Sequence, residues 1–362
     1  MTTNVMANYS YGEDCFKEIP SVLATYRIQS IAFVGGKRAL DSSEAEVRSI
    51  LEEANIKVTG SFVYGTDSTQ SNIDKLVANP QVQAADAILG FGGGKALDTA
   101  KMVAKELGKN SFTIPTICSN CSAGTAIAVV YNDDHSFLRY GYPESPLHIF
   151  INTRIIAQAP SKYFWAGIGD GISKAPEVER ATLEAKTNKL PHTAVLGQAV
   201  ALSSKEAFYQ FGEQGLKDVE ANLASRAVEE IALDILISTG YASNLVNQPD
   251  FYYNSCHAHA FYYGTTAAIQ RQGEFLHGVV VAFGVLVLHA YFNELEELEK
   301  VARFNKSLGL PTTLADVSLS EKDIPKIVEI AMTTNEYKNT PFDPKMFAQA
   351  ILAADAFGQT LA

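Results

Sequence analysis

The sequence lacks the marks of a membrane or secreted protein. Its longest apolar candidate, residues 279–288, is too short to cross a bilayer. The first twenty residues contain Glu13, Asp14 and Glu18 and show no apolar core of the signal-peptide type. We therefore expect a cytoplasmic protein without a membrane partner.

Positive charge is also scarce. The 362 residues include 29 lysines and arginines against 40 aspartates and glutamates, which gives a formal net charge of −11. The chain contains no basic block, so nucleic acid is not an expected partner. A hydrophobic content of 47% with 19% charged residues is typical of a soluble globular protein. The length allows two domains with sizeable cores.

Cysteine is rare as well, with four residues at positions 15, 118, 121 and 256. Their number and scatter do not indicate a disulfide scaffold in a chain of this length. Cys118 and Cys121 form a C-x-x-C pair, but a zinc site would need a second pair and a thioredoxin-like site a different context. We expect these thiols to lie in the core or to line a pocket.

Short apolar runs alternate with helical patterns in the first part of the chain. Strands are predicted at residues 6–11, 30–34, 56–64, 111–115 and 147–151, with a further strand starting at Ala87 and a hairpin at 127–140. Such alternation indicates βαβ units and a parallel sheet. From about Asn152, long helical patterns take over. We predict an α/β N-terminal nucleotide-binding domain (residues 1–152) plus an all-α C-terminal metal- and substrate-binding domain (residues 153–362), with a cleft between them.

The clearest motif is AILGFGGGKALDTAK, residues 87–101. An apolar run is followed by four glycines within five residues and then by a helical pattern. Glycines let the backbone approach a ligand, and a helix N-terminus attracts a pyrophosphate. The spacing fits neither G-x-G-x-x-G, because Lys95 occupies the last glycine position, nor a Walker A loop. We interpret the stretch as a dinucleotide cradle; the alternative is an ordinary strand–turn–helix junction.

A second group of candidate residues lies in the helical half. His259 and His277 are 18 residues apart, a spacing that fits one helix, a turn and the start of the next, so two imidazoles can converge on a cation. Asp170 stands among glycines in GIGDGI. Each has an ordinary alternative, because an acid in a first helical turn is a normal cap and histidines in apolar helices are usually core residues.

Together these motifs resemble the iron-containing alcohol dehydrogenase superfamily on its glycerol dehydrogenase side. The resemblance rests on GGGK-x-x-D-T-A-K, on PTI at residues 115–117, on AGIGD ending at Asp170, on AHA around His259 and on LHG at His277. It implies a dehydroquinate synthase-like architecture, a homo-oligomer and a small-molecule substrate. It also implies that Asp170, His259 and His277 hold one divalent metal.

The resemblance further implies a set of cofactor-binding residues: Gly92, Gly93, Gly94, Lys95, Asp98, Thr116 and Ser119. For Asp98 with Lys101, the alternative is an exposed i, i+3 pair on a helix. After the first strand, Gly36 and Lys37 stand where an acid would favour NAD, so Lys37 permits the 2′-phosphate of NADP. A solvated basic turn is equally compatible, and both dinucleotides stay open.

Three departures from the family pattern bear on chemistry. Lys174 replaces the histidine that is the fourth ligand of the iron-dependent branch, which favours Zn²⁺ over Fe²⁺ and leaves a coordination position open. Cys121 occupies the place of an aspartate that contacts the polyol in glycerol dehydrogenases, and it instead resembles the branch that reduces 2-oxo acids. Pro176 is expected to break or kink the helix that carries Asp170.

The sequence thus predicts a metal-dependent, NAD(P)-linked oxidoreductase that interconverts a small 2-hydroxycarboxylate, or a related alcohol, and its oxo form. Asp170, His259, His277 and Cys121 are the residues expected to carry catalysis. The alternatives are a glycerol or polyol dehydrogenase and a degenerate nucleotide-binding member with little turnover. A lyase of the dehydroquinate synthase kind is disfavoured, because residues 252–282 offer Arg271 as their sole basic side chain apart from histidines.

Overall fold

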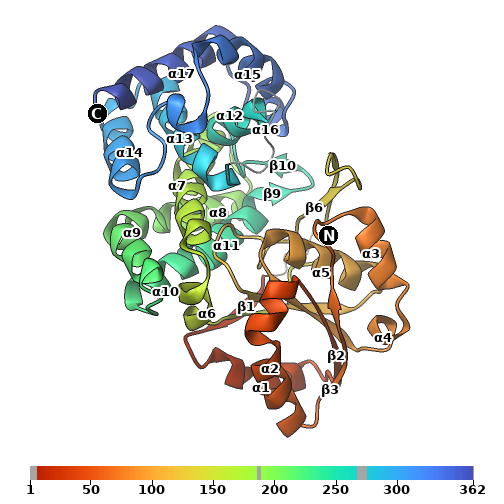
Figure 1. The fold of residues 1–362 in the computed structure, drawn as a ribbon. Coiled ribbons are helices and arrows are strands. Elements are labelled where there is room, and N and C mark those ends of the chain that lie inside the picture. Colours follow the sequence, from red (N-terminus) through yellow and green to blue (C-terminus); the bar gives the residue numbers. More distant parts are fainter. Residues whose placement is uncertain (1–5, 186–188, 267–274, 362) are drawn as a thin grey trace. The chain divides into compact units, whose positions relative to one another are not determined.

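The computed structural model describes residues 6–185, 189–266 and 275–361 (Figure 1). The chain forms two compact units. The first comprises the chain up to Ser161 together with Lys217–Tyr241, and the second comprises Lys162–Leu216 together with Ala242–Ala362. The predicted boundary after residue 152 stays a prediction.

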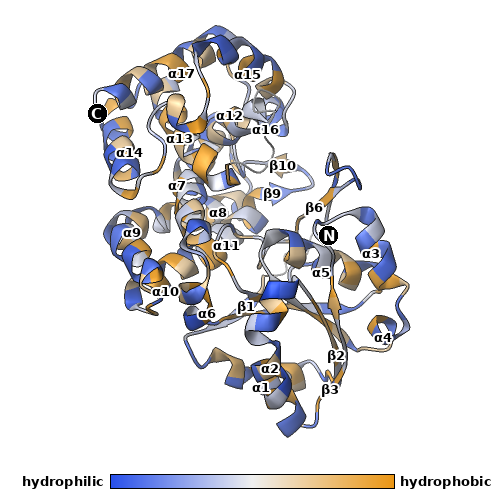
Figure 2. Ribbon diagram, in the orientation of Figure 1, coloured by the Kyte–Doolittle hydropathy of each residue, from blue (hydrophilic) through white to orange (hydrophobic). Residues whose placement is uncertain are grey.

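The first unit contains a six-stranded sheet in which every pairing is parallel, with strand order β1-β8-β5-β4-β2-β3. Its strands are β1 (Asn8–Tyr11), β2 (Ser30–Gly35), β3 (Lys57–Val63), β4 (Ala87–Gly92), β5 (Asn110–Pro115) and β8 (His148–Ile151). The inner strands β4 and β8 are buried along their whole length, as apolar runs in a parallel sheet require. The neighbouring strand β2 is largely hydrophobic in Figure 2. The predicted parallel sheet is confirmed.

Helices cover both faces of this sheet because successive residues of a strand point to opposite sides. Phe33 packs with Phe91 on the face covered by α1 (Ile19–Thr25) and α2 (Lys37–Glu53). Val34 and Ile88 pack on the other face against α3 (Gln70–Val77) and α5 (Gly94–Glu106). Also in this unit are η1 (Cys15–Glu18), α4 (Pro80–Gln83), α6 (Thr153–Gln158), α10 (Arg226–Leu233) and η2 (Asp234–Ser238).

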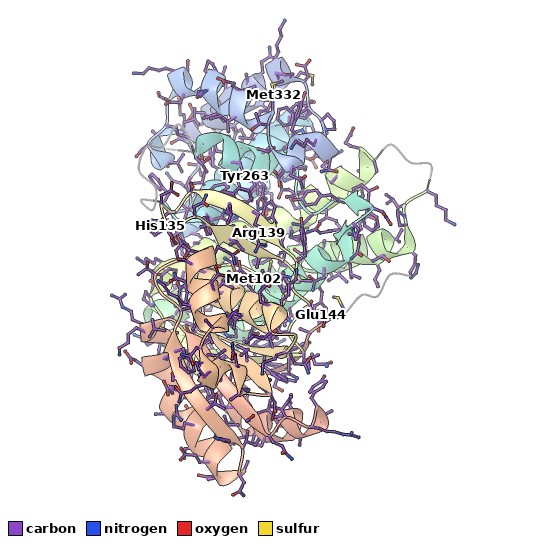
Figure 3. The ribbon with its side chains drawn as sticks, turned by 90° about the vertical axis from the view of Figure 1, so that its right-hand side faces the viewer. Met102, His135, Arg139, Glu144, Tyr263 and Met332 are labelled. Carbon is purple, nitrogen blue, oxygen red and sulfur yellow. The ribbon has the colours of Figure 1, made fainter. Side chains whose placement is uncertain are left out.

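A separate antiparallel hairpin follows β5 in the chain, as the sequence predicts. It pairs β6 (Ala128–Tyr131) with β7 (Phe137–Gly141). Arg139 of this hairpin donates to the Gln70 side chain at the start of α3 over 2.7 Å (Figure 3). The hairpin is thereby attached to the helical layer beside the sheet.

The second unit is mainly helical, which confirms the predicted fold class. Its elements are α7 (Ser161–Leu183), α8 (His192–Ser203), α12 (His257–Thr265), α13 (His277–Tyr291), α14 (Leu295–Leu308), η3 (Ala315–Val317), η4 (Glu321–Asp323), α15 (Ile324–Ala331), α16 (Asn335–Asn339), α17 (Pro344–Gln359) and the short strands β9 (Asn247–Gln248) and β10 (Phe251–Tyr252). Helices α9 (Lys205–Glu220) and α11 (Thr239–Val246) run across the division between the units.

The apolar run of residues 279–288 forms the buried body of α13, which packs against α12, α14 and α17. It is therefore a core helix of the second unit. None of the helices formed by the described residues combines the length and hydrophobicity that a membrane crossing needs.

Helix α7 continues through Pro176 to Leu183, so the predicted break is wrong. Proline removes one backbone hydrogen bond inside a helix. Here the neighbouring side chains of α7 tie this part of the helix to the segment that leads into α12. Lys174 donates to the Asn254 side chain and backbone, and Glu177 accepts from the backbone of α12. These tertiary contacts hold the helix on both sides of Pro176.

Candidate metal and cofactor sites

Three candidate metal ligands from three helices of the second unit converge. Asp170 lies in α7, His259 in α12, and His277 is the first residue of α13. The Oδ1 atom of Asp170 is 3.1 Å from Nε2 of His277 and 3.6 Å from Nε2 of His259. One potential ligand atom from each residue lies within 4.8 Å of the other two. The structure thus brings together the three residues that the sequence singles out.

A close helix crossing brings His277 to Asp170. Gly278 follows His277, and a Cβ atom placed on it would collide with the Ala166 carbonyl and lie 2.8 Å from the backbone nitrogen of Asp170. Only glycine allows the two helix backbones to approach this closely. The glycine in LHG therefore has a packing reason that belongs to the site itself.

Glu177 is part of this cluster, and the sequence reasoning missed it. It is fully buried, and its Oε2 atom lies 2.5 Å from Nδ1 of His259. Its Oε1 atom accepts the backbone N–H groups of Cys256 at 2.8 Å and His259 at 3.0 Å. Seven residues separate Glu177 from Asp170, which places both on one face of α7. That spacing was the available signal.

The cluster contains two buried carboxylates, Asp170 and Glu177, whose negative charge dominates its electrostatics. Burial disfavours the charged form of Asp170, but His277 and His259 outweigh burial and hold the pKa of that carboxyl far below its usual range. Burial also opposes protonation of His259, yet Glu177 and Asp170 outweigh it and raise its pKa to about 10. Two buried carboxylates therefore demand a cation, either a proton on the imidazole or a metal in its place.

The donor set fits a divalent metal such as zinc. One carboxylate and two imidazoles are a ligand set that leaves further positions for water or substrate. Glu177 accepts a hydrogen bond from the Nδ1–H group of His259, and this directs Nε2 toward the ligand position. Carboxylates commonly orient metal-binding histidines in this way. Lys174, one turn after Asp170, is buried with its ammonium 2.8 Å from the Asn254 side chain. An ammonium has no lone pair for a metal, so this position adds no ligand.

His257, two residues before His259, is not one of the three grouped candidate ligands. Its buried ring packs among the aromatic rings of Tyr291, Phe292, Phe342 and Phe347. Burial lowers its pKa to about 4. The structure thus places it in an aromatic core cluster. Arg271, considered above for lyase chemistry, lies outside the described residues.

The glycine motif occupies the carboxyl edge of the parallel sheet in the first unit. Strand β4 ends at Gly92, whose φ of +142° suits glycine alone among the common residues, and α5 begins at Gly94. The chain runs from β2 to β3 on one side and from β4 to β5 on the other. The loops after β2 and β4 therefore flank a topological switch point, where α/β sheets bind nucleotides.

A packing requirement also explains one of these glycines. A Cβ atom on Gly93 would collide with the side chain of Ile117, which follows β5. The backbone N–H of Thr116 donates to the Gly92 carbonyl over 3.1 Å, and Thr116 is buried. Ser119 and Cys121 follow in the same loop and are half-buried. The loop after β5 thus lies directly on the glycine turn.

The two candidate cofactor lysines have different surroundings. The ammonium of Lys95 is 2.8 Å from the buried carboxylate of Asp67, which also lies 2.9 Å from Nδ1 of His135 on the β6–β7 hairpin. His135 is labelled in Figure 3. Lys37 begins α2 and is exposed, with its ammonium 2.5 Å from Asp41. Lys95 is therefore fixed to the domain, whereas Lys37 forms a surface pair.

Asp98 and Lys101 form a buried pair, so the interpretation as an exposed pair is wrong. Their side chains are 9% and 0% exposed, and their charged atoms are 3.0 Å apart. The pair is thus almost completely withdrawn from solvent. No disulfide joins the four cysteines, all of which lie in the described part of the chain, and Cys15, Cys118 and Cys256 are buried. Cys121 belongs to the first unit, and the three candidate metal ligands belong to the second.

Comparisons with known proteins identify the family. The family model described as iron-containing alcohol dehydrogenase matches residues 7–147. A glycerol dehydrogenase of Escherichia coli O6:H1 is 31% identical over 339 residues, which cover 90% of this chain and 89% of that protein. The chain belongs to the iron-containing alcohol dehydrogenase family. Membership confirms the predicted superfamily and makes the chain a metal-dependent, NAD(P)-linked alcohol oxidoreductase.

Further relatives extend the range of substrates in the family. Hydroxycarboxylate dehydrogenase A of Escherichia coli K12 is 27% identical over 326 residues, covering 89% of this chain and 87% of that protein. The crystal structure of glycerol dehydrogenase from Schizosaccharomyces pombe superposes with a TM-score of 0.86 at 23% identity, covering 99% of this chain and 92% of that one. At this identity the structural likeness bears on the fold alone, which agrees with the predicted architecture.

Proposed function

We propose that this protein interconverts a small 2-hydroxycarboxylate and its 2-oxo form. In this proposal Asp170, His259 and His277 hold Zn²⁺, and the glycine turn of the first unit holds NAD or NADP. The observation that carries the proposal is the convergence of the three ligand atoms within 4.8 Å beside the buried Glu177. Burying the carboxylates of Asp170 and Glu177 beside two imidazoles is costly unless a cation neutralises them, and a divalent metal at the ligand atoms would do so.

The chemistry divides between bound groups and the chain's own residues. When bound, the metal supplies Lewis acidity toward the substrate oxygen and the dinucleotide supplies the hydride acceptor or donor. Asp170 contributes the negative charge of the ligand set. Glu177 keeps the His259 ring in one orientation and keeps the proton on Nδ1. The N-terminus of α5, which has no side-chain cap, offers N–H groups to a pyrophosphate.

Zinc is favoured over iron by the ligand count. The iron-dependent branch uses a fourth protein ligand four residues after the aspartate, and here Lys174 binds Asn254 instead. A three-ligand site leaves a position open for substrate, which suits catalytic zinc.

The substrate class rests on Cys121. A thiol is a poor acceptor for the hydroxyl groups of a polyol, whereas its neutrality spares the carboxylate of a 2-oxo acid from repulsion. The relative named hydroxycarboxylate dehydrogenase A supports this class. Glycerol oxidation is the second candidate, because the glycerol dehydrogenase of Escherichia coli O6:H1 has the higher identity of the two, at 31% against 27%.

The test combines metal analysis with a substrate panel. Purified protein would be assayed for zinc and iron, then for reduction of 2-oxo acids with NADH and NADPH and for oxidation of glycerol. About one zinc per chain with 2-oxo acid reduction is the expected result. Zinc with glycerol oxidation alone would replace the substrate but keep the site. Absence of both metal and turnover would favour a degenerate nucleotide-binding protein.

Two finer features belong to the same proposal. The assays with NADH and NADPH decide whether the protein accepts a 2′-phosphate. Lys37 is the candidate partner for that phosphate, although it pairs with Asp41. We also expect a homo-oligomer in the cytoplasm. Size-exclusion chromatography with light scattering would measure the oligomeric state. A monomer at micromolar concentration would contradict the expected assembly.

A further inference from the structure

A buried lysine lies at the centre of the loop that follows β5. The ammonium of Lys101 on α5 donates to three backbone carbonyls, those of Ser122 at 2.8 Å, Thr125 at 3.0 Å and Ile127 at 2.7 Å. The lysine is 1% exposed. A lysine ammonium has three N–H donors, and here every one of them has a carbonyl partner. The side chain thus acts as an internal cation around which the loop is folded.

Asp98 completes this arrangement from one turn earlier on α5. Its Oδ1 atom lies 3.0 Å from the ammonium and balances the buried charge. Its Oδ2 atom accepts the backbone N–H of Val129, the second residue of β6, over 3.0 Å. The two side chains therefore bind the chain at four points between residues 122 and 129. A single helix face of α5 determines the course of that whole segment.

The same loop bears directly on the glycine turn. Ile117 occupies the space that a side chain on Gly93 would need, and Asn120 lies within 3.0 Å of the position of a Cβ on Gly94. The N–H of Ser122 donates to the Asn120 side chain over 3.1 Å, which links this contact to the part held by Lys101. A change in the loop would therefore change the surroundings of the first residues of α5.

We propose that Lys101 and Asp98 are positioning residues that hold the loop of residues 116–127 in the shape needed for dinucleotide binding. This inference rests on the proposed function, because it takes the glycine turn as the dinucleotide site. It gives Asp98 a different role from the direct cofactor contact that the family resemblance implies. The carboxylate acts through the loop, and its atoms are engaged by Lys101 and Val129.

The test separates loop positioning from general stability by probing the loop directly. Lys101→Met removes the cation and keeps the length of the side chain, and Lys105→Met makes the same change at an exposed position of α5 as the matched control. Cys118 lies within the loop, is 1% exposed, and burial raises the pKa of its thiol, so alkylation of the folded protein is slow. Mass spectrometry of iodoacetamide-labelled peptides reports how often the loop opens.

In Lys101→Met we expect Cys118 to be alkylated roughly tenfold faster and NADH to bind roughly tenfold more weakly by fluorescence titration. Zinc content should stay at the wild-type value, because the candidate ligands belong to the other unit. Lys105→Met should match the wild type in every measurement. A folded Lys101→Met protein with unchanged alkylation and unchanged NADH affinity would overturn the proposal, even if its melting temperature falls.

Asp98→Asn covers the case in which Lys101→Met does not fold. The amide oxygen of asparagine can still accept from Val129, while the charge opposite Lys101 is lost. We expect smaller changes in the same directions, and wild-type alkylation together with wild-type NADH affinity in this variant would also overturn the proposal. If the wild type binds NADH but turns over no substrate in the panel, the proposed reaction fails while the alkylation and binding comparisons still decide the role of the loop.

Discussion

Two buried charge clusters, one in each unit, differ in how they are neutralised. In the first unit, the cation of Lys101 is matched by Asp98 and three carbonyls. In the second unit, the carboxylates of Asp170 and Glu177 face two imidazoles that are neutral whenever they bind a metal. The first cluster pairs one carboxylate with one ammonium, so its charges cancel within the protein. The second has a surplus of negative charge.

This difference separates structural from ligand-binding roles. A buried charge is tolerated when the protein pairs it and satisfies its hydrogen bonds. A cluster that meets this condition with its own atoms can hold backbone in place and needs no ligand. A cluster in which two carboxylates face two neutral imidazoles is stable only when a proton or a metal ion supplies the missing positive charge. The comparison predicts that changes in the second unit act on metal and changes in the first act on the dinucleotide.

The largest expected effect comes from removing a ligand of the second cluster. His277→Ala should abolish retention of zinc and reduce turnover at least about a thousandfold, because two remaining ligands do not hold the metal. NADH affinity should be largely unchanged. The measurements are metal content after gel filtration and steady-state rates, with His192→Ala, at the exposed first residue of α8, as the control. Full activity in His277→Ala would contradict the metal assignment.

A smaller loss is expected from Glu177→Gln. The amide cannot balance a charge on the cluster, and it offers His259 a weaker acceptor, so the ring is less firmly oriented. We expect zinc affinity to fall by about 10-fold to 100-fold, measured by competition with a chromophoric chelator. Glu179→Gln, two residues further along α7 and only partly buried, is the control. Equal zinc affinity in both variants would show that Glu177 serves only to anchor α12.

The same clusters show where sequence reasoning succeeds and where it stops. The strands, the hairpin and the convergence of Asp170, His259 and His277 were predictable, because local hydrophobic patterns and recognisable motifs mark them. The carbonyl cage around Lys101 was not, because backbone carbonyls have no sequence signature. The break expected at Pro176 is wrong, because a local rule was applied to a helix that tertiary contacts support. Glu177 was overlooked although its spacing from Asp170 on α7 was visible.

A buried group without charge provides a third case for the comparison. His148 on β8 is 7% exposed, with its Nε2 atom 2.9 Å from Ser10 Oγ, and burial lowers its pKa to about 4. Its folded pKa lies below the unfolded value near ~6.5, so its neutral form stabilises the fold above that pH. This contribution should be lost as pH falls from about 6.5 to about 4, by roughly 2 kcal/mol.

His148→Gln keeps a hydrogen-bonding side chain and removes the titration. Urea unfolding of both proteins at pH 7 and pH 4 measures the effect as a difference between differences, in which other titrating groups cancel. We expect the variant to lose less stability than the wild type over this interval. Identical losses of stability in the two proteins would mean that the His148 ring is reached by solvent or paired with a charge. It would then not be a neutral buried group, and the comparison would be left with the two charge clusters.

The smallest expected effect concerns specificity and tests whether the loop held by Lys101 serves the substrate as well as the dinucleotide. Cys121→Asp places a carboxylate at the position where glycerol dehydrogenases carry one. Because a carboxylate accepts hydrogen bonds from hydroxyl groups and repels the anionic end of a 2-oxo acid, we expect the ratio of kcat/KM for glycerol to that for 2-oxo acids to rise about tenfold. Zinc content and NADH affinity should not change. An unchanged substrate ratio in Cys121→Asp would mean that the loop acts on the dinucleotide alone. Lys101 and Asp98, which hold the loop, would then have no part in the choice of substrate.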